Sequence, residues 1–566
     1  MSLFGSLQLA SNAMQAQQIG LQVVGQNMAN ANTPGYSREE VQLAPAPDQQ
    51  LGHLTLGLGV QVNGVTQVVD QYLNERLRGT NSDVSNSQTQ AQAYQNLETI
   101  VGALDQNNLQ SSLSSFFSAI SGVLNQPESV SVRNLAVLQG KTLAGAVNQT
   151  SQRVSNARSD LNNQVIGMTS DINRLVTDVA KLNVEITSTE GGDASSSQAV
   201  GLREQRNQDL TDLSKLIGIK TEAQPSGAVN VYVGGDYLVF EGTSRQVQTA
   251  YTTDRGLSAA HINLIDTNAP LDTQTGQLTG LLTARDQILG GFLDNLNQFA
   301  STLNFEFNKV YSSGQGLTGF QSMTSTNPVK SASAPLDNAG LPFTPASGAF
   351  QVQMLNTQTG LTQTTTINVD LNGLDQNETS LNGLVSQFNA VNGLSASIDA
   401  SGNLTLKTTS PDLQFSFAND NSGALAALGL NTFFTGSTAA DLGVNQNLVN
   451  DPGKFAASTA GVGIDAGNAT TLANFMNQPL ASAGGTTLSD LYNTMVGDVT
   501  QGSSVAQSVA QGYQTFQQTL QGQQSAVSGV SIDEETVKML AYQRAYEASA
   551  KLISTINDLL KTLMQL

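Results

Sequence analysis

Apolar residues recur near the start of the chain at alternating spacings of three and four. The positions are Leu3, Leu7, Ala10, Met14, Gln17, Leu21, Val24, Met28 and Ala31, with one glutamine among them. Sustained over four heptads, this period is typical of a helix with a narrow apolar seam that packs against another helix. Asn30, Asn32, Pro34 and Gly35 are turn-forming residues, so the pattern predicts that the helix ends there.

The end of the chain carries a second heptad pattern. Ser531 and Glu534 have the spacing of a capping box, and the acidic residues 533–535 suit the positive end of a helix dipole. Residues 537–566 contain no glycine or proline. The seam positions are Tyr542, Ala545, Ser549, Leu552, Ile556, Leu559, Leu563 and Leu566. Two such helices at opposite ends of the chain predict that the termini meet as a coiled coil.

The first half of the chain between these ends alternates in character. Residues 36–69 combine short apolar stretches with glycines and predict extended structure. Residues 70–190 have helical periodicity, and a shorter helix is expected near 198–217. Alternating apolar residues over 229–233 and 237–240 flank two glycines, which indicates a β-hairpin.

The second half contains the most distinct change of pattern. Residues 289–310 have the period of an amphipathic helix. From residue 315 to about 450 the chain predicts a β-rich region, with a hairpin over 394–406 and one short helix near 379–390. Helical periodicity returns over 453–525.

These elements predict a mainly α protein with a β-rich insert, built from discontinuous, nested domains. Terminal coiled-coil helices enclose a helical-bundle domain with a small β-hairpin region at about 219–265, and that domain encloses an outer β domain. The expected domains are 1–69 (N-terminal helix and extended segment), 70–314 (first part of the helical domain), 315–452 (β insert), 453–530 (second part of the helical domain) and 531–566 (C-terminal helix).

Composition excludes several classes of function. The chain of 566 residues has 24 Lys and Arg against 44 Asp and Glu, a formal charge of −20, so we expect no nucleic-acid partner and no binding to anionic membranes. Apolar runs are too short for a membrane-spanning helix. Residues 1–37 carry no charged side chain, so the basic start of a cleaved signal peptide is missing. We therefore expect a chain that is cytoplasmic, or one exported without such a signal.

Candidate chemical motifs are weak. The chain has no cysteine and only two histidines. Gly140-Lys141-Thr142 resembles the end of a phosphate-binding loop, but Leu135 stands where that loop needs glycine. Residues 105–116 lack the glycine and the final glutamate of a calcium loop. We therefore predict no metal, no cofactor and no catalytic site, and a protein that is not an enzyme.

The segment after the N-terminal helix carries a resemblance to a known group of proteins. It reads Ala29-Asn30-Ala31-Asn32-Thr33-Pro34-Gly35-Tyr36-Ser37-Arg38. This string, directly after a charge-free heptad helix, closely resembles the N-terminal signature of bacterial flagellar axial proteins, which include rod, hook and hook-associated proteins.

The other end of the chain selects among these proteins. The segments 528–535 (SGVSIDEE) and 541–551 (AYQRAYEASAK), together with Phe433 to Ser437, resemble the family of flagellar hook-associated protein 1, the hook–filament junction proteins. Hook or distal rod protein is the alternative within the same class. A secreted surface adhesin that binds through the β insert is the alternative from another class.

The resemblance implies a structural subunit of the bacterial flagellum, exported unfolded by the flagellar type III apparatus and located outside the cell in a ring-like zone between hook and filament. It implies four partners: further copies of the chain, hook protein, hook-associated protein 3 and an export chaperone.

We assign residues to these roles as follows. The expected assembly interface is Leu3, Leu7, Met14, Leu21, Val24 and Met28, with Tyr542, Leu552, Ile556, Leu559 and Leu563. The family motif is Ala29, Asn30, Asn32, Thr33, Pro34, Gly35 and Tyr36. The candidate chaperone-binding residues are Leu552, Ile553, Ile556, Leu559, Leu560 and Leu563, which form a broad apolar helix face suited to a groove on a partner.

Overall fold

A computed structural model describes most of the chain as long helices with several small sheets, which confirms the predicted fold class. The described residues are 3–33, 35–51, 54–102, 109–191, 199–374 and 378–565. Pro34, His53, residues 105–107 of the supposed calcium loop and Leu566 therefore lie outside them. The chain divides into two compact units, and each is described separately. Unit 1 comprises residues 1–93, 159–286 and 504–566, and unit 2 comprises residues 94–158 and 287–503.

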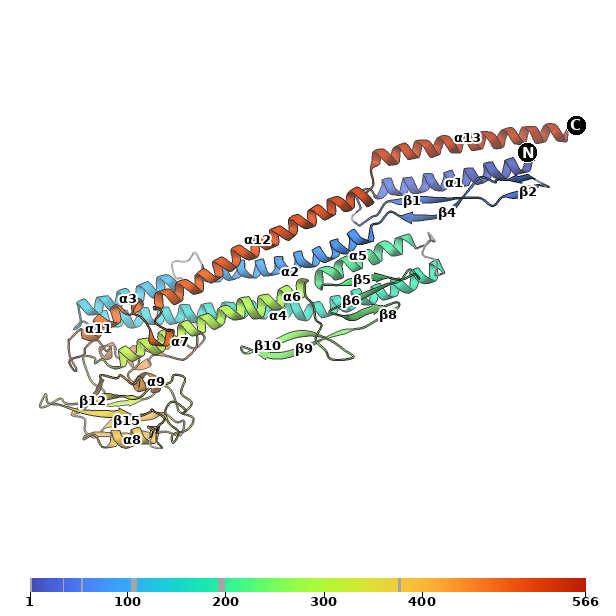
Figure 1. The fold of residues 1–566 in the computed structure, drawn as a ribbon. Helices are drawn as coiled ribbons and strands as arrows, with labels where there is room; N and C mark the ends of the chain where they lie inside the picture. The colour runs from blue at the N-terminus through green and yellow to red at the C-terminus, as the bar shows by residue number, and fades with distance from the viewer. Residues whose placement is uncertain are drawn as a thin grey trace. The chain divides into compact units, whose positions relative to one another are not determined.

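Unit 1 contains both chain ends. Helix α1 (Leu3–Asn30) packs along α13 (Ile532–Met564), and the strands β1 (Glu39–Pro45) and β4 (Val60–Gln67) pack on α1 (Figure 1). The two strands pair antiparallel with a bulge after Gln42, and a second short pair is β2 (Gln49–Leu51) with β3 (Leu54–Leu56). The predicted helices at the two ends and the predicted extended segment after the first are confirmed.

The rest of unit 1 is a layer of helices on small sheets. Parts of α2 (Gln71–Val101), α4 (Val130–Glu190) and α12 (Leu488–Ser528) belong to it, with α5 (Val200–Leu216) and α6 (Gln277–Thr283). The strands are β5 (Lys220–Ala223), β6 (Val229–Val233), β7 (Asp236–Phe240) and β8 (Thr243–Ser244) in one sheet, and β9 (Val247–Asp254) with β10 (Leu257–Leu264) as a hairpin. Apolar residues of α4 and α5 pack against both sheets to form one core.

The predicted hairpin of β6 and β7 is confirmed. Both of its turn glycines have positive φ, +56° at Gly234 and +95° at Gly235, which glycine adopts far more readily than residues with a Cβ. A side chain at Gly234 would also collide with Asp272. The turn therefore requires glycine both for its backbone conformation and for space.

The helices of unit 2 meet around a cluster of aromatic rings. Its helices are α3 (Leu109–Asn125), the first part of α4, α7 (Gly290–Ser312), which follows the π-helical turn Ala284–Leu289, α10 (Gln446–Asn450), α11 (Gly467–Ala473) and the first part of α12. The cluster consists of Phe116, Phe117, Phe307, Tyr311, Phe433, Phe434, Phe455 and Phe475, with neighbouring ring centroids 4.8 to 6.3 Å apart. Such packing adds to the stability that burial alone supplies.

The predicted helical stretch over 453–525 forms a continuous helix only from Leu488 onward. Before it, the chain forms α11 and three short 3-10 turns, Pro452–Lys454, Phe475–Asn477 and Ala481–Ala483. Glycines with positive φ at 461, 463, 484 and 485 explain the interruptions.

The β insert of unit 2 has its own core. Its elements are β11 (Ser322–Thr324), β12 (Gly348–Asn356), β13 (Thr362–Val369), α8 (Leu381–Asn389), β14 (Leu394–Ile398), β15 (Leu404–Thr408), β16 (Leu413–Ala418), α9 (Ala424–Leu428), β17 (Phe434–Thr435) and β18 (Gly443–Val444). Three strands pair in the order β13, β12, β16 and three in the order β11, β15, β14. The predicted hairpin over 394–406 and the helix near 379–390 are confirmed as β14 with β15 and as α8, which Ser380 caps.

The Gly140-Lys141-Thr142 string lies inside helix α4. A Cβ on Gly140 would lie 2.5 Å from the ring of Phe433, so glycine is required because an aromatic ring packs on the helix backbone.

We expect Gly140→Ala to lower the stability of unit 2 by about 1 to 3 kcal/mol, because it overpacks this contact. Gly145→Ala is the matched control, since Gly145 lies on the same helix and a Cβ there would have no atom within 4 Å. It should instead gain up to about 1 kcal/mol from helix propensity. Thermal unfolding of both variants measures the difference, and equal shifts would refute the explanation.

Candidate assembly interface

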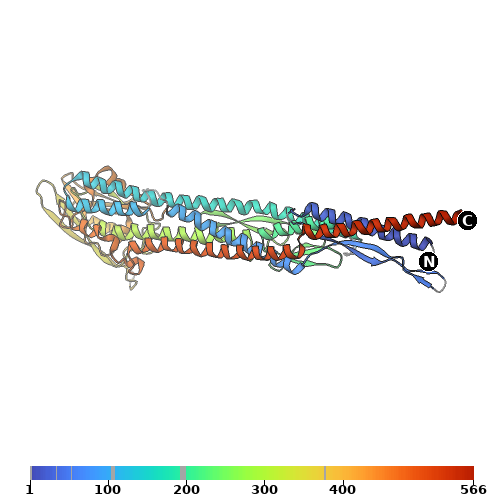
Figure 2. The ribbon, with the colours of Figure 1, turned by 90° about the horizontal axis from the view of Figure 1, so that it is seen from above.

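The two terminal helices run antiparallel with a defined register. A Cβ on Gly20 of α1 would lie 2.8 Å from the ring of Tyr542, and Asn27 donates a hydrogen bond to Glu535 at 3.0 Å. Seven residues forward on α1 thus correspond to seven residues backward on α13. The two chain ends consequently lie at the same end of the helix pair (Figure 2).

The seam of α13 differs from the predicted one. Glu535 and Ile556 are buried, and the half-buried positions of this helix are Thr536, Lys538, Met539, Tyr542, Ala545, Tyr546, Ser549, Ala550, Ile553 and Leu560. The prediction shares Tyr542, Ala545, Ser549 and Ile556 with this set, but it also placed Leu552, Leu559 and Leu563 in the seam. These three side chains are 42%, 52% and 61% exposed. Of the chaperone candidates, Ile556 is therefore buried, Ile553 and Leu560 are half-buried, and the other three are exposed.

The physical reason is an ambiguity in the sequence. Apolar residues occupy both members of the pairs 552 and 553, and 559 and 560, so either of two helix faces fits a heptad pattern. The hydrogen bond from Asn27 to Glu535 is compatible with only one rotation of α13, and that rotation turns Ile553 and Leu560 inward.

On α1 the structure buries smaller residues than the prediction chose. Val24 is buried as expected, while Leu3, Leu7, Met14, Leu21 and Met28 are half-buried. The buried residues that the heptad pattern missed are Ala16, Gly20, Val23 and Asn27, and Ala10 is buried too. Small side chains let two helix backbones approach closely, so the spacing of Ala16 and Gly20 was the available signal.

Asn27 is the centre of a buried polar network. Its side-chain amide donates to the backbone oxygen of Glu39 at 2.9 Å and to Glu535 at 3.0 Å. Its side-chain oxygen accepts from the backbone N–H of Glu39 at 2.9 Å and from the Tyr36 hydroxyl at 2.8 Å. The full hydrogen-bonding capacity of the asparagine is used, and it joins α1, the family motif, β1 and α13.

Ion pairs surround this network. Lys538 contacts Glu535 at 2.9 Å and Glu40 at 3.7 Å, and Arg38 contacts Glu40 and Glu534, each at 3.6 Å. Arg38 also donates its backbone N–H to the Ser528 oxygen at 2.8 Å. The charged residues just after the N-terminal motif therefore meet the charged residues at the start of α13.

The surroundings of the network also raise the pKa values of two of its groups. Burial raises the pKa of the Glu39 carboxyl, and the nearby Glu204 carboxylate raises it further. Burial also raises the pKa of the Tyr36 hydroxyl, with Glu39, Glu204 and Glu535 contributing in the same direction. Tyr36 therefore keeps the proton that it donates to Asn27 throughout the physiological range.

The family motif forms a tight turn. Thr33 donates its backbone N–H to the Asn30 oxygen at 2.9 Å, and Tyr36 donates to the Thr33 oxygen at 3.2 Å. Gly35 has a φ of +84°. Ala29 and Asn32 are exposed, and Pro34 lies outside the described residues. A cavity of about 270 Å³ is lined by residues 31–37, apart from Pro34, and by Gln524, Ser525, Ser528, Gly529 and Val530. The motif therefore connects α1 to the junction of α12 and α13.

The outward side of α13 carries large apolar side chains. Val537, Leu540, Leu552, Leu559 and Leu563 are between 42% and 68% exposed. An extended apolar face of this kind is typical of a surface that is covered in an assembly.

Metal-binding clusters and membrane-spanning helices are absent from the part of the chain that the structure describes. Over the described ranges, no group of three or more histidine, aspartate or glutamate side chains is placed to hold a metal ion. No helix within those ranges is long and apolar enough to cross a membrane.

Three protein-family models match segments of the chain. Residues 94–324 match the helical domain of flagellar hook-associated protein FlgK, residues 7–36 match the flagella basal body rod protein family, and residues 522–566 match the C-terminal region of flagellar basal body rod FlgEFG proteins. Flagellar hook-associated protein 1 of Salmonella typhimurium is 24% identical, with 98% of this chain and 99% of that protein covered. The chain is therefore similar over nearly its whole length to flagellar hook-associated protein 1.

Further relatives agree with this similarity. Hook-associated protein 1 of Bacillus subtilis is 25% identical over 99% of this chain and 97% of its own length. The flagellar hook junction protein FlgK of Burkholderia pseudomallei shares the fold, with a TM-score of 0.52 and 15% identity over 80% of this chain and 100% of that structure. The matches to 7–36 and 522–566 contain Asn27, Tyr36 and Glu535, so the main side chains of the polar network lie in regions typical of flagellar proteins.

Proposed function

We propose that this chain is a structural subunit of the bacterial flagellum that joins the hook to the filament, and that its terminal helices assemble into a ring-like junction. The observation that carries the proposal is the combination of a register-locked pair of terminal helices with an apolar outer face on α13. The pair is held by Asn27 and Glu535, while Leu559 and Leu563 stay exposed. The outer face is then available to further subunits.

The proposed partners follow from this arrangement. In the junction, copies of the chain contact one another, hook protein lies on one side and hook-associated protein 3 on the other. The chain reaches this place outside the cell through the flagellar type III export apparatus. The matched helical domain over 94–324 favours a hook-associated protein over the alternative of a hook or rod protein.

Before export, a chaperone holds the C-terminal helix. Leu552, Leu559 and Leu563 are already exposed, whereas Ile553, Ile556 and Leu560 become accessible only when α13 leaves α1. A chaperone groove that takes all six residues therefore competes with α1 for the same helix. This competition keeps the terminal pair from forming before secretion.

Leu559→Asp tests the assembly proposal. The substitution places a charge on the apolar outer face, and burying that unpaired charge in an assembly costs several kcal/mol. We expect the variant to fold. Because Leu559 is also one of the proposed chaperone-binding residues, the amount secreted into the medium is measured as well, and the secreted variant should be absent from the hook tip, so that cells lose their filaments. Immunolabelling of hooks and counting of filaments by electron microscopy measure this.

Ser554→Asp is the matched control, because it adds the same charge to an exposed polar position of α13 that does not share the face of Leu552 and Leu559. It should assemble normally. Normal incorporation of Leu559→Asp would contradict the proposed interface, and circular dichroism of both variants verifies that the helices remain folded.

A further inference from the structure

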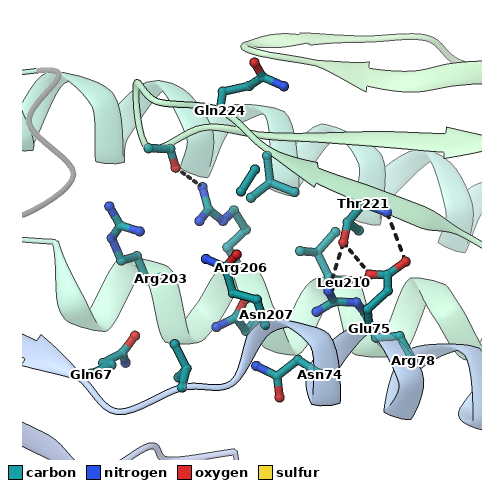
Figure 3. Close-up of a pocket in the computed structure, with 15 residues that line it drawn as sticks. Gln67, Asn74, Glu75, Arg78, Arg203, Arg206, Asn207, Leu210, Thr221 and Gln224 are labelled. Atoms are coloured by element: carbon teal, nitrogen blue, oxygen red, sulfur yellow. Dashed lines mark hydrogen bonds and ion pairs between the residues drawn. The ribbon is translucent and has the colours of Figure 1, made fainter.

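Unit 1 contains a polar cavity away from the terminal helices. It has a volume of about 240 Å³ and lies between the start of α2, the helix α5 and the strands β5 and β6. Three arginines line it, Arg78, Arg203 and Arg206. Figure 3 shows Arg206 between Arg203 on one side and the cluster of Glu75, Arg78 and Thr221 on the other.

The positive charges of this cavity are not fully balanced. Arg78 pairs with Glu75 at 2.9 Å. Arg203 pairs with the buried Glu190 through two hydrogen bonds, at 2.9 and 2.5 Å. Each of the two carboxylates is thus engaged by its own arginine.

Among the described residues, Arg206 has only neutral hydrogen-bond partners. It donates from Nη1 to the side-chain oxygen of Asn183 at 2.9 Å and to the backbone oxygen of Gly227 at 2.8 Å. Its residue surface is only 4% exposed. A buried cation without an anionic partner is costly, so Arg206 is the uncompensated charge of the cavity.

Three lining residues also present N–H groups without an acceptor. Arg206 Nε, Arg78 Nε and Gln67 Nε2 are buried, and within the described part of the chain none of them has a hydrogen-bond partner. Buried polar atoms are normally satisfied. All three unpartnered atoms are hydrogen-bond donors, so a ligand that satisfies them must carry acceptor atoms and cannot be a cation.

The charges around Arg206 also favour an anion. Burial, and then repulsion by Arg203 and Arg78, lower the pKa of Arg206 to about 10, and Glu190 opposes the shift. Arg206 remains charged at neutral pH, and the three guanidinium groups are close enough to influence one another. An anion between them would relieve both the repulsion and the missing hydrogen bonds.

We propose that this cavity binds one small oxyanion, the size of phosphate or of a side-chain carboxylate, through Arg206, Arg78 and Gln67. The oxyanion is either free in solution or carried by an acidic side chain of a second copy of the chain. Both have oxygen atoms that accept from guanidinium and amide donors.

Thermal unfolding in inorganic phosphate tests the site, with chloride at the same ionic strength as the reference. At a phosphate concentration several times the Kd for the folded chain, the Tm of the natural sequence should rise by about 2 to 4 °C. Arg206→Gln should remove this rise. Arg174→Gln is the control, because it removes one positive charge from an exposed position of the same unit and should keep the full rise.

A second variant covers the case in which Arg206→Gln unfolds the protein. Gln67→Leu removes one orphaned donor and adds no charge, and it should reduce the affinity for phosphate about tenfold in isothermal titration calorimetry. Equal phosphate stabilisation of the natural chain and both cavity variants, or none in the natural chain, would overturn the proposal.

Sedimentation distinguishes the two sources of the oxyanion. If the natural ligand is a free anion, phosphate leaves a monomer unchanged. If the ligand is a side chain of another copy, phosphate dissociates self-associated chains.

Discussion

Asn27→Leu should separate the terminal helices. The substitution removes four hydrogen bonds at once and leaves the N–H of Glu39, the hydroxyl of Tyr36 and one oxygen of Glu535 without their partner. Each unsatisfied buried group costs about 1 to 3 kcal/mol, so we expect the pairing of α1 with α13 to lose about 3 to 5 kcal/mol. Hydrogen exchange of the α13 amides and urea unfolding measure the loss.

Gln26→Leu is the matched control, since Gln26 is the exposed neighbour on the same helix. It should leave the exchange of α13 unchanged, whereas identical exchange in both variants would show that the network does not hold the pair. The double variant Asn27→Leu with Glu535→Leu makes a further check. It should recover part of the loss, because replacing a buried polar pair by apolar side chains removes the unsatisfied groups.

The sequence predicted the terminal pair but not its centre. Heptad spacing is a property of one helix at a time, so it showed that residues 3–31 and the C-terminal helix each have a seam. It could not distinguish Leu559 from Leu560 as the seam residue, because the helix rotation depends on Asn27 meeting Glu535, 508 residues away. A buried asparagine also does not appear in an apolar pattern.

Local signals were sufficient for the smaller elements. The glycines at 234 and 235 and the alternation around them determine a hairpin within one stretch of the chain, and the structure has it. The function of Gly140 required the fold, because Phe433, the ring that packs on it, lies 293 residues later. The cavity around Arg206 could not be predicted for the same reason, since Gln67, Arg78 and Arg206 come from separate elements and share no motif.

Gly20→Leu should force α1 and α13 apart at the middle of their contact. The ring of Tyr542 lies on the backbone of Gly20, and even a Cβ there would approach three ring carbons to between 2.8 and 3.0 Å. We expect overpacking to cost the pair about 1 to 3 kcal/mol, although leucine favours the helical state over glycine by nearly 1 kcal/mol. Urea unfolding that is monitored at the terminal helices gives the free energy, and a swimming assay gives the consequence for the junction.

Gly25→Leu separates these two effects, because Gly25 lies on the same helix with no atom within 4 Å of a Cβ position. It should stabilise α1 slightly and preserve swimming. If the close contact with Tyr542 is the cause, Tyr542→Ala should cost less stability in the Gly20→Leu background than in the natural chain, because the ring that collides with the leucine is gone. If the losses of stability from the two substitutions simply add, the defect arises within α1 and not from the contact with Tyr542. The antiparallel register would then be supported only by the hydrogen bond between Asn27 and Glu535.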